Sequence, residues 1–261
     1  MTQKHYQYIF GPVYSWRLGV SLGIDPISQK GKTCNFDCLY CQLGKTTNPQ
    51  NERRVFVPTK KIIEEIKQLP DLQIDYLTLT SSGEPTLAKN LGEIIQALRT
   101  VRKEKIAVIT NASLMHQEDV RRDLLLADHV LIKLDSCSQE TLEAINRPVA
   151  SMSFQKIVDG IKKLKSNFQG KLSLQIMFVR ENKKFAQLLA DLAKEVNSDE
   201  VELNTPLRTC AVTPLSKDEL DKLKKYFHDL PFVSVYDKTK KHVEPLNVED
   251  AIKRHGSYQK E

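Results

Sequence analysis

Residues 74–110 read IDYLTLTSSGEPTLAKNLGEIIQALRTVRKEKIAVIT and contain a strand, a polar turn, a helix and a second strand. The segment 74–80 is rich in β-branched and aromatic residues, and the segment 106–110 is short and apolar, which is typical of buried strands. Between them, apolar residues recur at helical spacing at Leu91, Ile94, Ile95 and Leu98. Two strands joined by a helix predict a parallel pair with a right-handed crossover.

The same alternation continues on both sides of this unit. Strands are expected at 18–27, 129–134, 172–179 and 201–203, and helices begin near Thr59, Val120, Ser153, Phe185 and Ser216. Six strand–helix units by about residue 228 predict an α/β fold, a partial (β/α)6 TIM-like barrel with parallel strands. A doubly wound sheet remains an alternative. We expect residues 1–215 to form the barrel domain and 216–261 to form a C-terminal helix and polar extension packed on it. Residues 231–236 can add one strand.

The composition of the 261 residues is that of an ordinary globular protein, with 40% hydrophobic and 28% charged residues. No stretch approaches the ~18 consecutive apolar residues of a membrane helix, and MTQKHYQYIF has no apolar signal-peptide core. We therefore expect a soluble, cytoplasmic protein with no membrane association. The net charge of +6 permits an anionic partner without requiring one.

Five cysteines are present, and Cys34, Cys38 and Cys41 fall within eight residues. An odd number with this clustering argues against a disulfide framework and favours a metal or iron–sulfur site. One tight loop can direct three thiolates to a common centre, and three ligands would leave one iron of a [4Fe–4S] cluster open to a small chelating molecule. A structural zinc site with Cys137 or Cys210 as the fourth ligand remains an alternative.

Polar residues follow the predicted strands, where α/β folds gather their functional groups. They are Ser81 to Pro85, Thr110 to Ser113, Lys133 to Ser136, Arg180 to Asn182 and Asn204 to Pro206. We expect these clusters and the cysteine loop to surround one mouth of the barrel.

The motif CNFDCLYC at 34–41 resembles the CxxxCxΦC signature of the radical S-adenosylmethionine superfamily, with Tyr40 as the aromatic residue. Ser-Gly-Glu-Pro at 82–85 stands where that superfamily has its GGE motif. The phrases GPVYSWRLGVSLGIDPI, LTSSGEPTL, ITNASL, INRP and LNTP look more specifically like the branch of wyosine-tRNA synthases. The resemblance covers residues 8–216.

The resemblance implies that Cys34, Cys38 and Cys41 ligate three irons of a [4Fe–4S] cluster and that the fourth iron chelates S-adenosylmethionine. An electron from a donor such as flavodoxin or ferredoxin would cleave the sulfonium and give a 5′-deoxyadenosyl radical that abstracts hydrogen. Other residues would contact the cofactor: Gly83 and Glu84 its amino group, with Ser82 in the same turn, Asn111 and Ser113 the methionyl or ribose part, and the Tyr40 backbone the adenine. Asp135, Glu181 and Asn182 are further candidates for cofactor binding, and Lys133, Arg147 and Cys210 for substrate binding.

Basic residues near the cysteine loop suit RNA phosphates, so a tRNA base is one candidate substrate. They are Lys30, Lys32, Lys45, Arg53, Arg54, Lys60 and Lys61. They equally suit an acidic protein partner or a solvated loop. Residues 1–33 contain no cysteine, unlike wyosine-tRNA synthases, which argues against the pyruvate-condensing reaction of that branch. A radical enzyme acting on a protein or small molecule, and a non-catalytic iron–sulfur or zinc module, remain alternatives.

Overall fold

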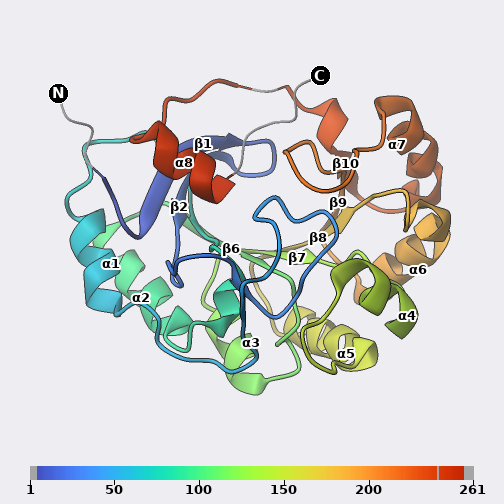
Figure 1. Cartoon of the computed structure of the whole chain (residues 1–261), viewed down its shortest axis with the longest axis horizontal. Helices are drawn as coiled ribbons and strands as arrows, with labels where there is room; N and C mark the ends of the chain where they lie inside the picture. The colour runs from blue at the N-terminus through green and yellow to red at the C-terminus, as the bar shows by residue number, and fades with distance from the viewer. Residues whose placement is uncertain (1–4, 240, 256–261) are drawn as a thin grey trace.

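One curled eight-stranded sheet forms the centre of the molecule, and the helices lie around its outer side (Figure 1). The computed structural model describes residues 5–239 and 241–255. Only the first pair of strands is antiparallel, and every other neighbouring pair is parallel. In sheet order the strands are β1 (Ile9–Ser15), β2 (Gly19–Ile24), β5 (Tyr76–Leu79), β6 (Lys105–Thr110), β7 (His129–Lys133), β8 (Lys171–Met177), β9 (Glu200–Asn204) and β10 (Phe232–Ser234).

The longer helices of the described chain are α1 (Thr59–Ile66), α2 (Leu91–Val101), α3 (Glu118–Leu124), α5 (Phe154–Lys165), α6 (Ala186–Val196), α7 (Lys217–Leu223) and α8 (Val248–His255). Shorter elements connect them: β3 (Thr33–Cys34), β4 (Asn48–Pro49), η1 (Pro85–Leu87), α4 (Gln139–Thr141), η2 (Leu142–Asn146), η3 (Lys183–Phe185), η4 (Lys224–Phe227) and η5 (Val235–Asp237). None of the described helices is long and apolar enough to cross a membrane.

The helices pack through the apolar stripes that the sequence indicates. Ile94, Ile95 and Leu98 of α2 are completely buried, as is Ile62 of α1. Side-chain caps fix where two helices begin. The Ser153 hydroxyl accepts a hydrogen bond from Lys156 N, and Ser216 forms a reciprocal capping box with Glu219. Helix α1 ends at Ile66, a few residues before Pro70.

The partial-barrel prediction is confirmed, because all six predicted strands pair in parallel in chain order. The possible strand at 231–236 is also present, as β10 beside β9. Strand β1 is a difference from the sequence analysis, which had no strand before residue 18. It pairs with β2 as an antiparallel hairpin with an irregularity between Phe10 and Val13. Gly11 and Pro12 fall inside that irregularity, and Gly-Pro normally indicates a break in a strand.

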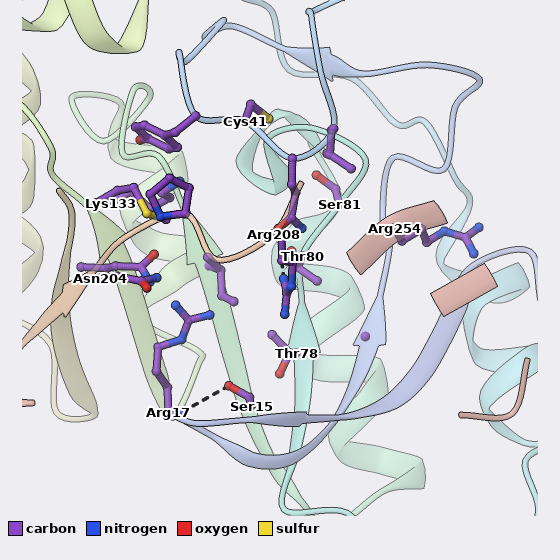
Figure 2. Close-up of a pocket in the computed structure, with 18 of the residues that line it drawn as sticks. Ser15, Arg17, Cys41, Thr78, Thr80, Ser81, Lys133, Asn204, Arg208 and Arg254 are labelled. Carbon is purple, nitrogen blue, oxygen red and sulfur yellow. Dashed lines mark hydrogen bonds between the residues drawn. The ribbon is translucent and has the colours of Figure 1, made fainter. Parts of the chain in front are cut away.

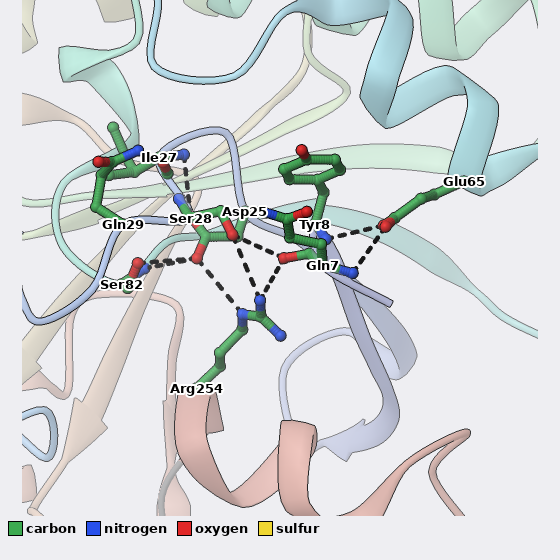
Figure 3. Close-up of polar contacts among 9 residues, drawn as sticks. All are labelled: Gln7, Tyr8, Asp25, Ile27, Ser28, Gln29, Glu65, Ser82 and Arg254. Carbon is green, nitrogen blue, oxygen red and sulfur yellow. Dashed lines mark hydrogen bonds and ion pairs between the residues drawn. The ribbon is translucent and has the colours of Figure 1, made fainter. Parts of the chain in front are cut away.

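The C-terminal helix α8 lies beside β1, and its Arg254 reaches the end of β2 (Figure 3). The Asp25 carboxylate forms an ion pair with Arg254 at 3.5 Å and accepts hydrogen bonds from Ser28 N and the Ser82 hydroxyl at 2.8 and 2.9 Å. This cluster joins α8 to the strand ends. The predicted boundary between residues 215 and 216 stays a prediction, and residues 256–261 of the expected extension lie outside the described residues.

Candidate active site

A cavity of about 270 Å³ opens at the carboxyl ends of the parallel strands. Its wall includes side chains from β2, β5, β6, β7, β8 and β9, together with the cysteine loop. Figure 2 shows Cys41 at one end of this cavity and Ser15, Arg17 and Thr78 at the other. With the exception of Arg180 to Asn182, each strand-end cluster predicted from the sequence therefore contributes at least one residue to this mouth, as does the cysteine loop.

The cysteine loop is docked by backbone pairing with the polar turn after β5. Thr33 N donates to Ser82 O at 2.9 Å, and Glu84 N donates to Thr33 O at 3.2 Å. A tight turn, closed by Cys41 N donating to Cys38 O at 3.1 Å, follows within the loop. As a result the thiols of Cys34, Cys38 and Cys41 all line the same cavity.

Two of the three sulfur atoms accept N–H hydrogen bonds from the surrounding protein. Cys34 Sγ lies 3.4 Å from Phe36 N and 3.7 Å from Asn111 Nδ2, and Cys38 Sγ lies 3.5 Å from Asn146 Nδ2. Burial, followed by the charge of Glu84, raises the pKa of the Cys34 thiol to about 12. A bound metal must therefore displace a proton at this position, while the N–H donors would stabilise the thiolate that results.

A buried lysine lies among the cysteines. Lys32 is 5% exposed, and its ammonium donates to Gly44 O at 3.3 Å and lies 3.6 Å from Asp37 Oδ1. Burial alone would lower its pKa, but Cys41, Cys34 and Cys38 outweigh burial and raise the pKa above its usual value. A cation held here complements an anionic group bound by the three thiolates.

The donor set fits a multi-iron cluster better than a single ion. Among the described residues, no three His, Cys, Asp or Glu side chains converge closely enough to hold one metal ion. The zinc alternative named Cys137 or Cys210 as a fourth ligand, and neither of these residues lines the cavity with the three other cysteines. Three thiols that line one cavity without converging to single-ion distance, with a buried cation beside them, suit the size, charge and thiolate preference of an iron–sulfur cluster.

Glu84 presents a carboxylate held in a fixed orientation at the cavity wall. Its Oε1 accepts hydrogen bonds from Thr86 Oγ1 and Thr110 Oγ1 at 2.6 and 2.7 Å, and its Oε2 accepts from Asn111 N at 2.8 Å. Burial raises the pKa of Glu84, and these hydrogen bonds oppose that shift. A cationic group entering the cavity would meet an oriented acceptor.

One known family model matches a segment that contains both the cysteine loop and several of the barrel strands. The model of the radical SAM superfamily matches residues 29–193, which include the cysteine loop and β5 to β8. This chain belongs to the radical SAM superfamily.

Relatives of this radical SAM chain include a UPF0026 protein of Synechocystis sp., 41% identical over 201 residues that cover 77% of this chain and 76% of that protein. A probable GTP 3′,8-cyclase of Saccharolobus solfataricus is 26% identical over 219 residues, covering 82% of this chain and 67% of the relative. The crystal structure of Streptococcus suis SuiB bound to S-adenosylmethionine matches with a TM-score of 0.60 at 17% identity, over 81% of this chain and 49% of SuiB.

These matches support the superfamily and the fold, but they correct the finer resemblance. The relatives carry the names UPF0026 and GTP 3′,8-cyclase, so the branch of wyosine-tRNA synthases is not specifically indicated.

Some of the residues predicted to bind the cofactor or the substrate line the cavity of this radical SAM chain, and the rest lie elsewhere. Those at the wall, besides the three cysteines, are Tyr40, Gly83, Glu84, Asn111 and Lys133. Those elsewhere are Ser82, Ser113, Asp135, Arg147, Glu181, Asn182 and Cys210.

Asp135 and Asn182 form a buried network behind the wall. The Asp135 carboxylate accepts hydrogen bonds from the Tyr40 hydroxyl and from Met177 N. The Asn182 amide donates to Asp135 O and Met177 O, both at 3.0 Å, and its oxygen accepts from Val179 N at 2.8 Å. Both side chains thus hold Tyr40 and the end of β8 in place, and neither reaches the cavity.

The other predicted site residues that do not line the cavity each have different neighbours. Ser82 donates to Asp25, and the buried Ser113 hydroxyl accepts from Asn35 Nδ2 at 2.6 Å. Arg147 and Glu181 are exposed. The Cys210 thiol donates to Val212 O at 3.3 Å and packs beside Tyr40 outside the cavity. These positions lend no support to the predicted cofactor or substrate contacts.

Among the polar residues that bear on the site without having been predicted from the sequence are Arg17, Asn146, Gln175 and Glu202. Arg17 and Gln175 line the cavity, and Glu202 is completely buried. A polar residue inside an apolar strand was the available signal, because Gln175 interrupts LSLQIMFV and Glu202 interrupts VEL. Asn146 donates to both Cys38 Sγ and the Tyr40 hydroxyl, and it stands in the phrase INRP, to which the resemblance assigned no role for Asn146.

Proposed function

We propose that this chain is a radical SAM enzyme whose Cys34, Cys38 and Cys41 hold a [4Fe–4S] cluster beside bound S-adenosylmethionine. When bound, the cluster supplies the electron that cleaves the sulfonium and releases a 5′-deoxyadenosyl radical for hydrogen abstraction. The observation that carries the proposal is that the three thiols and the Glu84 carboxylate line one cavity at the carboxyl ends of the strands. The crystal structure of SuiB, a neighbour in fold, has S-adenosylmethionine bound.

The residues around the cavity have distinct tasks in this proposal. Glu84 accepts hydrogen bonds from the methionine ammonium, and its own hydrogen bonds to Thr110 and Asn111 keep it from rotating away. Asn111 also donates to Cys34 Sγ and so connects the ligand loop with the Glu84 turn. Apolar side chains such as Phe10 and Ile109 line the same space and exclude water from a reactive radical.

The first experiment tests the cluster and its ligands. After anaerobic reconstitution the protein should carry about four irons and, with a strong reductant, convert S-adenosylmethionine to 5′-deoxyadenosine. Cys38→Ala should abolish the product. Cys137→Ala is the matched control and should retain it, because Cys137 does not line the cavity. Zinc without iron, or full activity of Cys38→Ala, would refute the assignment. The predicted electron donor, a flavodoxin or ferredoxin, can replace the chemical reductant in the same assay.

A small polar molecule is the substrate class that the cavity supports best. The cavity is enclosed by the strands of the partial barrel, and its polar lining extends from the cysteines to Arg17 and Gln175. The names of relatives agree with chemistry outside RNA, since one is a probable GTP 3′,8-cyclase and the SuiB neighbour has been crystallised with a precursor peptide.

A tRNA base is the second candidate, because exposed basic residues remain near the cysteine loop. They are Lys30, Lys45, Arg54, Lys60 and Lys61. Two others are unavailable, since Lys32 is buried and Arg53 forms ion pairs with Asp119 and Asp123. Comparing modified nucleosides from cells with and without the protein tests this candidate. Unchanged nucleosides in every RNA class would exclude it.

A further inference from the structure

A row of polar residues runs across the cavity from the cysteine end, where Lys133 lies over the Tyr40 ring, toward Arg17. Lys133 of β7, Gln175 of β8 and Glu202 of β9 are direct partners across three neighbouring parallel strands. Lys133 and Gln175 line the cavity, so the same row directs Glu202 toward the barrel interior. Arg17, from the turn between β1 and β2, also lines the cavity, and its Nε lies 3.7 Å from Glu202 Oε2. We call Arg17, Gln175 and Glu202 the floor.

The polar atoms of the floor are buried without hydrogen-bond partners. Glu202 is 0% exposed and Gln175 is 3% exposed. Among the described residues, Arg17 Nε, Gln175 Nε2 and both carboxylate oxygens of Glu202 have no hydrogen-bond partner. Buried polar groups are almost always paired, and an unpaired one is costly. Two of these side chains, Arg17 and Gln175, line the cavity, where a bound ligand could supply a partner.

The surroundings confine these groups to the cavity. Leu18, Ala107 and Leu131 form a separate apolar cluster, of which Leu18 lines the cavity. The nearby hydroxyls of Ser21 and Thr78 already satisfy each other at 2.6 Å. Arg17 Nε faces Glu202, so the unpaired Gln175 amide and the rest of the Arg17 guanidinium are the donors that a ligand in the cavity can meet.

The charges of the groups lining this part of the cavity indicate what kind of ligand could bind there. The groups that face the cavity here are donors: the Arg17 guanidinium, the Gln175 amide and, one strand further, the Lys133 ammonium, which lies 4.4 Å from the centre of the Tyr40 ring. The Glu202 side chain does not line the cavity, and its Oε2 lies 3.7 Å from Arg17 Nε. An arginine fork with an added amide donor is suited to an oxyanion.

We propose that the floor binds an oxyanion of the substrate, a carboxylate or a phosphate group, through Arg17 and Gln175. This inference rests on the proposed function, because it assigns the substrate class of the same cavity. With its oxyanion at the floor, the substrate directs its other end toward the cysteine loop, where hydrogen abstraction would take place. Glu202 is a positioning residue that orients the guanidinium.

The test measures binding of inorganic phosphate and, separately, succinate to the reconstituted protein by isothermal titration calorimetry. Fluorescence of Trp16, the single tryptophan of the chain, serves as a local reporter, because its ring lies 5.2 Å from the Arg17 guanidinium carbon. Arg17→Gln should weaken binding of the preferred probe at least about tenfold, the typical loss of a charge-assisted contact. Arg180→Gln, at an exposed arginine away from the cavity, should leave binding unchanged.

Each outcome has a defined meaning. Binding of phosphate alone identifies a phosphoryl group, binding of succinate alone identifies a carboxylate, and binding of both identifies a shared oxyanion site. Saturable binding that survives Arg17→Gln, or the absence of saturable binding of both probes, overturns the inference. Should Arg17→Gln fail to fold, the double variant Arg17→Gln/Glu202→Gln removes the guanidinium without leaving a buried carboxylate unpaired.

The same preparations separate this inference from the proposed function. If the wild-type chain yields 5′-deoxyadenosine but binds neither anion, the floor assignment fails and the radical SAM assignment stands. If it binds an anion through Arg17 but never cleaves S-adenosylmethionine, the proposed function fails and the anion site remains.

Discussion

Gly83 lies so close to Thr33 that a Cβ atom built on it would come within 1.5 Å of the Thr33 carbonyl oxygen. The neighbouring atom is backbone and belongs to β3, the two residues that carry the first cysteine of the loop. In the sequence analysis this glycine was assigned to close approach of a cofactor. The structure shows that its missing side chain already admits the cysteine loop itself.

Gly83→Ala should therefore push the cysteine loop away from the turn after β5. Overpacking of this kind costs about 1–3 kcal/mol, and a clash with backbone belongs at the upper end of that range. We expect lower thermal stability together with reduced iron incorporation, measured by unfolding and by iron analysis after reconstitution. Ser81→Ala is the matched control for the docking of the loop, because the Ser81 hydroxyl makes no hydrogen bond to the cysteine loop or to any other described residue. Equal iron content in Gly83→Ala and wild type would contradict the docking role.

Glu181 and Asn182, adjacent residues in the segment after β8, should differ strongly in how far their truncation destabilises the fold. Asn182→Ala removes three buried hydrogen bonds and leaves Val179 N without its acceptor, so we expect a loss of about 2–4 kcal/mol in the free energy of unfolding. Glu181→Ala, at an exposed side chain, should stay within about 0.5 kcal/mol of wild type. Urea unfolding of both variants decides the matter. A stable Asn182→Ala protein that no longer binds S-adenosylmethionine would instead support the cofactor contact predicted from the sequence.

Lys32 should tune the cluster that its neighbours are proposed to hold. A buried ammonium favours the more negatively charged, reduced form, so Lys32→Met should lower the midpoint potential. We expect a shift on the order of 60 mV, the one-electron equivalent of a tenfold change in equilibrium constant. A redox titration followed by electron paramagnetic resonance measures it.

Two further variants make the Lys32 measurement specific. Lys45→Met removes an exposed lysine of the same loop and should leave the potential unchanged. Lys32→Arg keeps the positive charge and should recover most of the shift. A Lys32→Met protein with the wild-type potential would show that the ammonium supports only the loop conformation, through its bond to Gly44 O.

Periodicity and position in the chain predicted most of the fold. Strands such as IAVIT and helices with stripes such as Ile94, Ile95 and Leu98 have one dominant pattern, and tertiary packing did not override it. Strand β1 was missed because Gly11 and Pro12 interrupt its alternating pattern, although it pairs with β2 in a local hairpin. The order of the strands also predicted that the cysteine loop and the other loops after the parallel strands would meet at one end of the sheet.

Side-chain direction explains where the site prediction was less successful. Asp135 and Asn182 follow their strands as expected. Successive side chains point to opposite sides of the chain, however, and these two point into the buried layer behind the cavity wall. Burial also reversed the expectation for Lys32, which was grouped with surface charges and lies inside the loop. Gln175 and Glu202 could have been flagged as polar residues in apolar strands, but their alignment with Lys133 depends on the register of three strands.

Glu202 should make the stability of the protein depend on pH in an unusual direction. Burial raises its pKa from 4.5 to about 7, although the neighbouring Arg17 guanidinium opposes the shift. Below about pH 4.5 the group is protonated in both the folded and unfolded chains and contributes nothing. As the pH rises toward 7, the unfolded chain releases a proton that the folded chain retains, so the free energy of unfolding falls by about 3 kcal/mol through this group.

Glu202→Gln removes this titration while keeping the size of the side chain. Relative to wild type, the variant should therefore be about 3 kcal/mol more stable at pH 8 than it is at pH 4.5, whatever the constant cost of the substitution. Urea unfolding of both proteins at the two pH values gives the difference directly. A stability difference that does not change with pH would mean that Arg17 fully compensates the buried carboxylate, and that Glu202 is ionised throughout as its partner.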